Sequence, residues 1–123
     1  PPIYCDERQI KHVFLNLYLN AIQAMGPDGG KLVLKSFSVT REGKQFVAGE
    51  VNDSGGGISM DVIHKIFNPF FTTKDTGTGL GLSIVHKIVT RHFGQVEVHN
   101  REGEGVSFLV TLPAAEEGRA YLK

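Results

Sequence analysis

Apolar residues recur at helical spacing in two parts of the chain and alternate with polar residues in several others. The first pattern predicts a helix from about Asp6 to Met25, with Asp6 as its N-cap and the sequence GPDGG as its end. A second helix is predicted from about Gly79, with Gly94 as the C′ residue that ends it. The strands that the alternation predicts are Lys31–Thr40, Gln45–Asp53, Gln95–His99 and Gly105–Leu112, of which the first two form a hairpin around the turn REGK.

Between the second predicted strand and the second predicted helix, glycine, proline and phenylalanine interrupt the pattern. Ser59 is expected to cap a short helix that continues to about Phe67, and Pro69 ends it. The following sequence FFTTKDTG is expected to form an irregular loop. This order of helices and strands predicts an α/β fold, a two-layer sandwich in which helices cover one face of a mixed sheet.

Composition favours one soluble domain over residues 1–123, with a core over about 5–113 and a polar tail over 114–123. The 13 basic and 13 acidic residues balance, which argues against a nucleic-acid partner and against direct membrane contact. The single cysteine, Cys5, excludes an intrachain disulfide. The first residues, PPIYCDERQ, indicate a piece of a longer cytosolic protein.

Polar residues form one stripe on the first predicted helix, whose other positions are mostly apolar, so that this helix is expected to be largely buried. His12, Asn16, Asn20 and Gln23 stand at positions i, i+4, i+8 and i+11. The stripe is either an exposed polar seam or one wall of a pocket. In a pocket, amide oxygens would suit a Mg²⁺ ion that keeps several waters and binds phosphates.

Three further segments combine glycine with polar or apolar residues. Asp53 precedes SGGG, which forms either a plain turn or a site where the carboxylate accepts a hydrogen bond from a ligand amine. Phe67 and Phe70 in FNPFFTTK are expected to pack in the core, and Lys74 beyond them could meet a phosphate. TGTGLGL is neither a P-loop nor a dinucleotide fingerprint, but its backbone N–H groups and the helix that follows could bind phosphate oxygens.

Taken in order, NLYLNA, DSGGG, FNPFF and GTGLGL resemble the N, G1, F and G2 boxes of the catalytic ATP-binding domain of sensor histidine kinases, in the GHKL superfamily. The resemblance covers about Cys5 to Pro113, and TTK before the last box resembles the nitrogen-regulator subgroup. It implies the histidine-kinase ATP-binding fold and a domain that binds Mg-ATP and donates the γ-phosphoryl group to a histidine.

The same resemblance implies a role for individual residues. Asn20 would coordinate Mg²⁺ beside Asn16, Asp53 would bind the adenine amino group, and Lys74 would reach the phosphates from an ATP lid over Phe71–Thr78. Asn16, Asn20 and Lys74 are the expected catalytic residues, and Asn20 is the expected metal ligand. The residues expected to contact ATP are Asn16, Asn20, Asp53, Gly55, Gly57, Ile58, Lys74, Thr78, Gly79, Leu80, Gly81 and Leu82.

One position favours a kinase over an ATPase. ATP-hydrolysing relatives such as gyrase carry a glutamate, one helical turn before the metal-binding asparagine, as the general base for water. Here that position is Asn16, whose amide cannot accept the proton. An ATP-hydrolysing clamp-type domain is therefore the alternative, and a degenerate scaffold without nucleotide binding is a third.

The phosphoacceptor is expected outside this chain. None of its five histidines is followed by the acidic residue and the nearby Thr/Asn–Pro of the family's acceptor helix, and His12 is expected only to support the metal site. The partners implied are the dimerisation and histidine-phosphotransfer domain of the same kinase and a response regulator receiver domain. The location implied is cytoplasmic, in a cytosolic protein or in the cytoplasmic part of a membrane-anchored sensor.

Overall fold

The computed structural model describes residues 2–27, 29–55, 81–101 and 105–115. The chain order of its elements is α1 (Glu7–Met25), β1 (Leu32–Arg41), β2 (Lys44–Asp53), α2 (Gly81–Arg91), β3 (Gln95–Arg101) and β4 (Gly105–Pro113). The two long helices and four strands expected from the sequence are confirmed, with ends shifted by at most two residues where both are described. The short helix predicted over Ser59–Phe67 and the loop FFTTKDTG lie outside the described residues.

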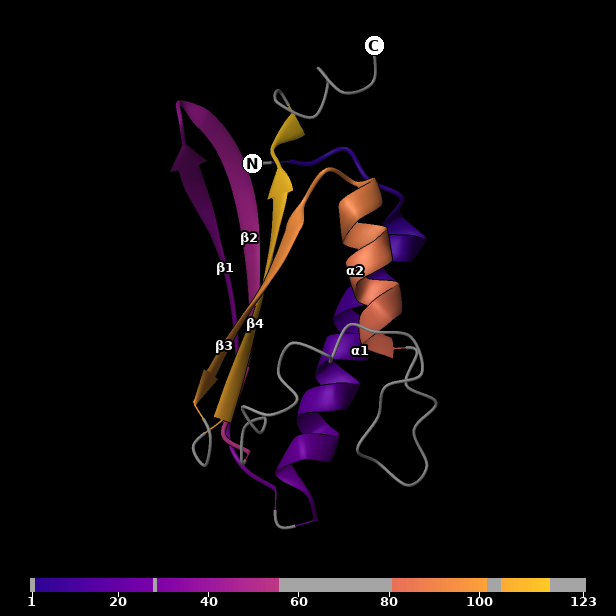
Figure 1. Ribbon diagram of the computed structural model, residues 1–123, viewed down its shortest axis with the longest axis vertical. Helices are drawn as coiled ribbons and strands as arrows, with labels where there is room; N and C mark the ends of the chain where they lie inside the picture. Colours follow the sequence, from indigo (N-terminus) through magenta and orange to yellow (C-terminus); the bar gives the residue numbers. More distant parts are fainter. Residues whose placement is uncertain (1, 28, 56–80, 102–104, 116–123) are drawn as a thin grey trace.

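The four described strands form one sheet in the order β1-β2-β4-β3, and α1 and α2 cover one of its faces (Figure 1). Every neighbouring pair is antiparallel, which corrects the expectation of a mixed sheet for these strands. The physical reason is the position of β4. The segment that contains α2 connects β2 to β3, two strands that run in the same direction, and β4 lies between them and pairs antiparallel with both.

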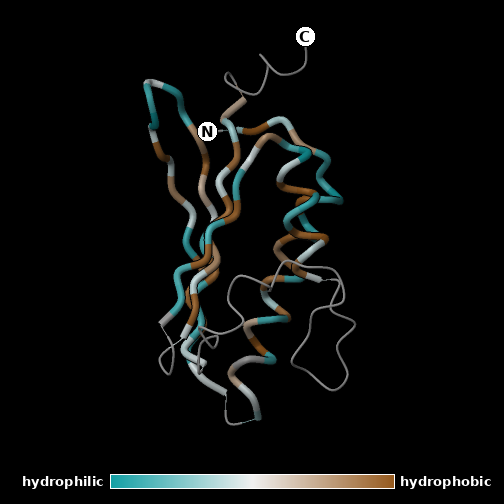
Figure 2. The backbone as a smooth tube through the Cα atoms, viewed as in Figure 1, coloured by the Kyte–Doolittle hydropathy of each residue, from teal (hydrophilic) through white to brown (hydrophobic). Residues whose placement is uncertain are grey.

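The hydrophobic core lies between the helices and the sheet. β4 is its central strand, because Val106, Phe108, Val110 and Leu112 are all at most 5% exposed. The helices contribute one buried stripe each: Val13, Leu17 and Ala21 from α1, and Val85, Ile88 and Val89 from α2. Hydrophobic and polar segments alternate along both helices, as their helical spacing requires (Figure 2).

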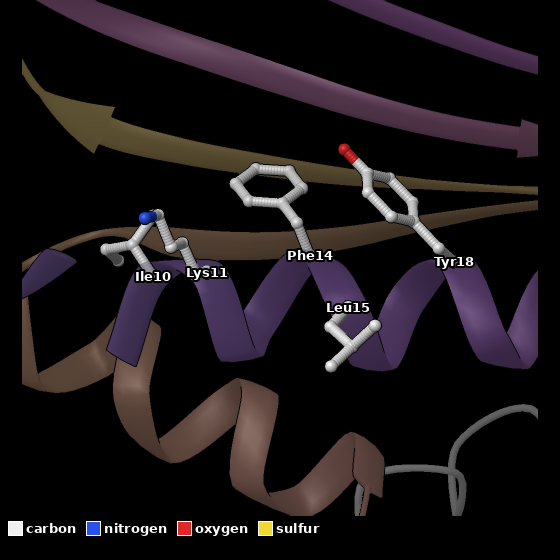
Figure 3. A pocket seen from close by; sticks show the side chains of 5 residues that line it. All are labelled: Ile10, Lys11, Phe14, Leu15 and Tyr18. Carbon is white, nitrogen blue, oxygen red and sulfur yellow. The ribbon is translucent and has the colours of Figure 1, made fainter. Parts of the chain in front are cut away.

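Helix α1 is less buried than the sequence predicts. Leu15, Leu19 and Ile22 are 47–54% exposed, because the apolar arc of α1 is wider than the surface that the sheet and α2 cover. Phe14 and Tyr18 lie between the buried stripe and these exposed residues and point toward the strands, while Leu15 does not (Figure 3). The prediction of a largely buried helix is therefore correct for one side only.

Each helix ends at a residue with positive φ. Gly26 closes α1 with φ 73°, as predicted. At the end of α2, Phe93 rather than Gly94 takes the left-handed conformation, with φ 62°. The Phe93 N–H donates to Thr90 O and the Gly94 N–H to Val89 O, the Schellman pattern with Phe93 at C′.

Gly94 is required for a different reason from the one predicted. A Cβ atom there would lie 2.3 Å from the backbone oxygen of Thr111, so that only glycine lets the chain pass this close to β4.

Ala114, which the sequence assigns to the tail, packs with the described domain. Ala114 is 2% exposed, and its N–H donates to Gln45 O at 3.0 Å. The Ala115 N–H donates to Pro2 O at 2.6 Å, which ties the N-terminal segment to the end of the sheet. In the described part of the chain, neither helix has the length and apolar character that crossing a bilayer requires.

Candidate functional site

Asp53 is a buried carboxylate at the end of β2, where its side chain is 4% exposed. Its Oδ1 accepts a hydrogen bond from the Gly55 N–H at 2.9 Å. Its Oδ2 is buried and has no hydrogen-bond partner among the described residues. Burial raises the pKa of Asp53, and the nearby backbone N–H groups of Gly55 and Val106 lower it in part. A buried acceptor of this kind is stabilised by a ligand that donates a hydrogen bond to it.

The backbone around Asp53 is fixed from two sides. The Ser54 N–H donates to Lys31 O at 3.1 Å, and Ser54 Oγ accepts from the Lys31 N–H at 2.7 Å. Gly105, at the start of β4, has φ 146°, and a Cβ atom there would lie 2.1 Å from Asp53 O. The sequence alone predicts no ligand contact for Ser54 or Gly105, although GEG before a strand is a signal for a close backbone approach.

The polar stripe on α1 divides into exposed and partly buried residues. His12 and Gln23, at its two ends, are exposed, whereas Asn16 and Asn20 between them are partly buried. Asn16 Nδ2 is buried without a hydrogen-bond partner among the described residues. At its centre, the polar stripe is therefore partly buried rather than exposed to solvent.

Asn16 lies beside the first turn of α2. A Cβ atom built at Gly81, the first residue of α2, would be 3.6 Å from Asn16 Oδ1. The N-terminus of an 11-residue helix carries backbone N–H groups without helical partners and a partial positive charge, both of which favour an anion. The structure thus brings Asn16 and Gly81 together.

The other predicted site residues fall into two groups. Gly55 is partly buried in the turn after Asp53, and Leu82 is partly buried and packs against the core rather than standing free. Gly57, Ile58, Lys74, Thr78, Gly79 and Leu80, together with the predicted lid Phe71–Thr78, lie outside the described residues.

The described groups fit a ligand that combines a hydrogen-bond donor, an anion and a bound divalent cation. The buried Asp53 Oδ2 requires a hydrogen-bond donor, and an exocyclic amine on a purine is such a donor. The start of α2 suits an anion, and amide oxygens such as those of Asn16 and Asn20 suit a hydrated divalent cation. An adenine nucleotide with Mg²⁺ carries all three features.

Comparison with known proteins identifies relatives of the whole chain. Residues 5–116 match the family described as histidine kinase-, DNA gyrase B- and HSP90-like ATPase. Sporulation kinase E of Bacillus subtilis strain 168 is 41% identical over 122 residues, which is 97% of this chain and 16% of that protein. The sensor histidine kinase ZraS of Escherichia coli strain K12 is 47% identical over 113 residues, which is 92% of this chain and 23% of that protein.

Solved structures share the fold. The nucleotide-free catalytic domain of histidine kinase ThkA is 42% identical with a TM-score of 0.80, over 95% of this chain and 74% of that one. Full-length ShkA in complex with AMPPNP is 31% identical with a TM-score of 0.79, over 92% of this chain and 23% of that one. These similarities confirm the fold class expected from the sequence.

Proposed function

Because the chain belongs to the histidine kinase-, DNA gyrase B- and HSP90-like ATPase family, as the catalytic ATP-binding domain of a two-component sensor histidine kinase, we propose that the site around Asp53 and Asn16 binds ATP with Mg²⁺. The chain spans about a fifth of the length of the curated kinases that it matches, so the phosphoryl transfer of the whole protein is also a proposal. The buried Oδ2 of Asp53, which has no hydrogen-bond partner in the described part of the chain, is the observation that carries the assignment.

The adenine end of the ligand is assigned to the turn after β2. Asp53 Oδ2 accepts a hydrogen bond from the adenine amino group, and Oδ1 stays bound to the Gly55 N–H. Gly55, Gly57 and Ile58 shape the pocket for the base. Ser54 and Gly105 keep the Asp53 backbone in place while the base enters and leaves.

The phosphate end is assigned to the face where α1 meets α2. Asn20, with Asn16 beside it, holds Mg²⁺, which neutralises charge on the phosphates when it is bound. Gly79 and Gly81, with the backbone N–H groups of Thr78, Leu80 and Leu82, bind the phosphate oxygens, and Lys74 adds a positive charge. Gly81, the first described residue of α2, already adjoins Asn16.

The neutral side chain of Asn16 favours transfer to a histidine over transfer to water. A general base must accept a proton at neutral pH, and an amide does not. Hydrolysis by the domain alone is therefore slow, and the γ-phosphoryl group goes to a histidine on the separate dimerisation and phosphoacceptor domain. A response regulator receiver domain then takes it from that histidine.

The finer assignments follow from the same family. We assign the chain to the nitrogen-regulator-like subgroup, which the sequence TTK supports, and propose that the domain works in the cytoplasm. No surface of the domain is assigned to nucleic acid or to direct membrane contact.

A transfer assay tests the proposed function. The chain is mixed with the separately produced phosphoacceptor domain of its own kinase and with ATP labelled in the γ-phosphate. Label is expected on the acceptor histidine only when the chain is present. Asn20→Ala removes the transfer, whereas Asn52→Ala, on the sheet face away from the helices, leaves it within about twofold. Phosphate release by the chain alone that exceeds the transfer rate, and that Asn16→Ala abolishes, would instead assign the chain to the ATP-hydrolysing class.

A further inference from the structure

The imidazole of His92 joins the ends of the two helices that carry the site. His92 follows the last residue of α2, and its Nε2 accepts a hydrogen bond from the Asp6 N–H at 3.0 Å. Asp6 is the N-cap residue of α1. On the other side of the ring, Nδ1 lies 2.8 Å from Ile88 O, one turn back along α2.

These two contacts require one protonation state of the ring. A backbone N–H only donates, so Nε2 must be the unprotonated nitrogen that accepts from Asp6. Ile88 O only accepts, so Nδ1 must carry the proton. The neutral imidazole with its proton on Nδ1 satisfies both contacts. Protonation would place a second donor at Nε2, opposite the Asp6 N–H, and would break the link between the helices.

The hydrogen bond between Asp6 and His92 lies at the opposite end of the helix pair from the proposed nucleotide site. α1 and α2 run antiparallel, so that the start of α1 lies beside the end of α2 (Figure 1). Asn16 lies ten residues after Asp6 along α1, and Gly81 lies eleven residues before His92 along α2. At 1.5 Å of rise per residue, these are matched distances of about 15 and 16 Å. The pairs Asp6–His92 and Asn16–Gly81 are therefore two cross-contacts of one helix pair in one register.

We propose that neutral His92 is a positioning residue for the nucleotide site, which fixes the lengthwise register of α2 against α1 and thereby holds Gly81 beside Asn16. The proposal rests on the assignment of these two residues to the phosphate end of the ATP site. His92 touches no ligand in this account and acts only through the two helices.

The surroundings of His92 include other charged or titratable residues. The ring borders a hollow of about 390 Å³ between the N-terminal segment, the end of α2 and the end of β4, where Pro113 lies. The titratable or charged residues that line this hollow are Tyr4, Cys5 and Asp6 from the N-terminal segment and Arg91 from α2. The Asp6 carboxylate is already bound to the N–H groups of Arg8 and Gln9. The backbone N–H of Asp6 is the group that requires an acceptor from the ring.

Three substitutions separate the link from the bulk of the ring. In His92→Gln, the side-chain oxygen reaches as far as Nε2 and can accept from the Asp6 N–H. In His92→Asn, the shorter amide can still donate toward Ile88 O but cannot reach Asp6. His92→Phe keeps the ring and removes both polar atoms. The full 123-residue variants are compared by calorimetric titration with Mg-ATP and by the amide resonances of Gly81 and the Asn16 side chain without nucleotide.

Affinity for Mg-ATP is expected to fall about three- to tenfold in the Asn and Phe variants and to stay within about twofold in the Gln variant. Equal affinity in wild type and a folded Asn or Phe variant, or a Gln variant as weak as they are, would overturn the proposal. If Phe does not fold, the Gln and Asn pair decides.

The nucleotide-free resonances distinguish a failure of this proposal from a failure of the ATP assignment. The Gly81 and Asn16 resonances are expected to move in the Asn variant and to stay in place in the Gln variant. If they stay in place in both, His92 does not set the register, whatever the affinity for ATP. If they move as expected while wild type binds no Mg-ATP, the register role stands and the ATP assignment fails.

Discussion

Gly105 lies against Asp53 so closely that a Cβ atom on Gly105 would be 2.1 Å from the Asp53 backbone oxygen. Gly105 also has φ 146°, a conformation that side chains rarely adopt. Gly105→Ala is therefore expected to lower the free energy of unfolding by about 2 to 4 kcal/mol, measured by denaturant titration, because clash and backbone strain add together. Affinity for Mg-ATP should fall as well, since the Asp53 backbone must move.

Gly43→Ala is the matched control for this effect. Gly43 has φ 78° in the turn between β1 and β2, but a Cβ atom there would meet nothing within 4 Å. Only backbone strain remains, with an expected cost of about 1 kcal/mol and no change in nucleotide affinity. Equal losses of unfolding free energy in the two variants would show that the close contact with Asp53 does not contribute to the effect of Gly105→Ala.

Gly49 and Phe14 form a second close pair, between β2 and α1. A Cβ atom on Gly49 would be 2.7 Å from Cζ of the Phe14 ring. Gly49→Ala is expected to destabilise the chain by about 1 to 2 kcal/mol, because the ring must leave its place against the sheet. In a Phe14→Leu background the same change should cost at least about 0.5 kcal/mol less. A double-mutant cycle of unfolding free energies measures the difference, and additive effects would contradict the contact.

The elements of the fold could be predicted because their signals are local. Asp6 as a cap, Gly26 as a helix end and the REGK turn each act within a few residues, and each is confirmed. The antiparallel order of the sheet could not be read in this way, because the placement of β4 between β2 and β3 depends on long-range packing.

The predictions that were wrong also concern features that depend on long-range packing. Gly94 was expected to take the left-handed position, but Phe93 takes it, because Gly94 is needed for the approach to Thr111. The exposure of Leu15 depends on how much of α1 the sheet can cover, which helical spacing alone does not determine. For the candidate site, side-chain chemistry pointed to Asp53 and Asn16, whereas Ser54 and Gly105 contact the backbone around Asp53 and gave no such signal.

The stability of the nucleotide-free chain should depend on the charge of Asp53. Burial raises the pKa of Asp53 above the ordinary value of 3.8, so the folded state binds this proton at a higher pH than the unfolded state does. The stability of wild type relative to Asp53→Asn therefore falls as pH rises through the raised pKa, and it stays low at neutral pH.

Thermal unfolding without nucleotide is the measurement for this dependence. Asp53→Asn is expected to unfold at a higher temperature than wild type at neutral pH, with the difference closing toward pH 3.8. Glu50→Gln, three residues earlier in β2 and on the opposite face of the sheet, controls for the loss of one negative charge. A lower unfolding temperature for Asp53→Asn at neutral pH would contradict the cost of burying this carboxylate.

Cys5 is exposed, yet its thiol should react slowly. Desolvation raises the pKa of Cys5, and the charges of Glu7 and Asp6 raise it further, so less thiolate is present at pH 8 than on a free cysteine. Alkylation by iodoacetamide at about pH 8 is expected to be slower than for free cysteine, and Glu7→Gln should speed it. A rate equal to that of free cysteine would show that these neighbours have no effect.

Calorimetric titration of the chain with Mg-ATP tests the central claim, which is that the buried carboxylate of Asp53 binds the adenine of ATP. Wild type is expected to bind, Asp53→Asn to bind at least about tenfold more weakly, and Glu50→Gln to bind like wild type. No binding by wild type, or equal binding by wild type and Asp53→Asn, would contradict the claim.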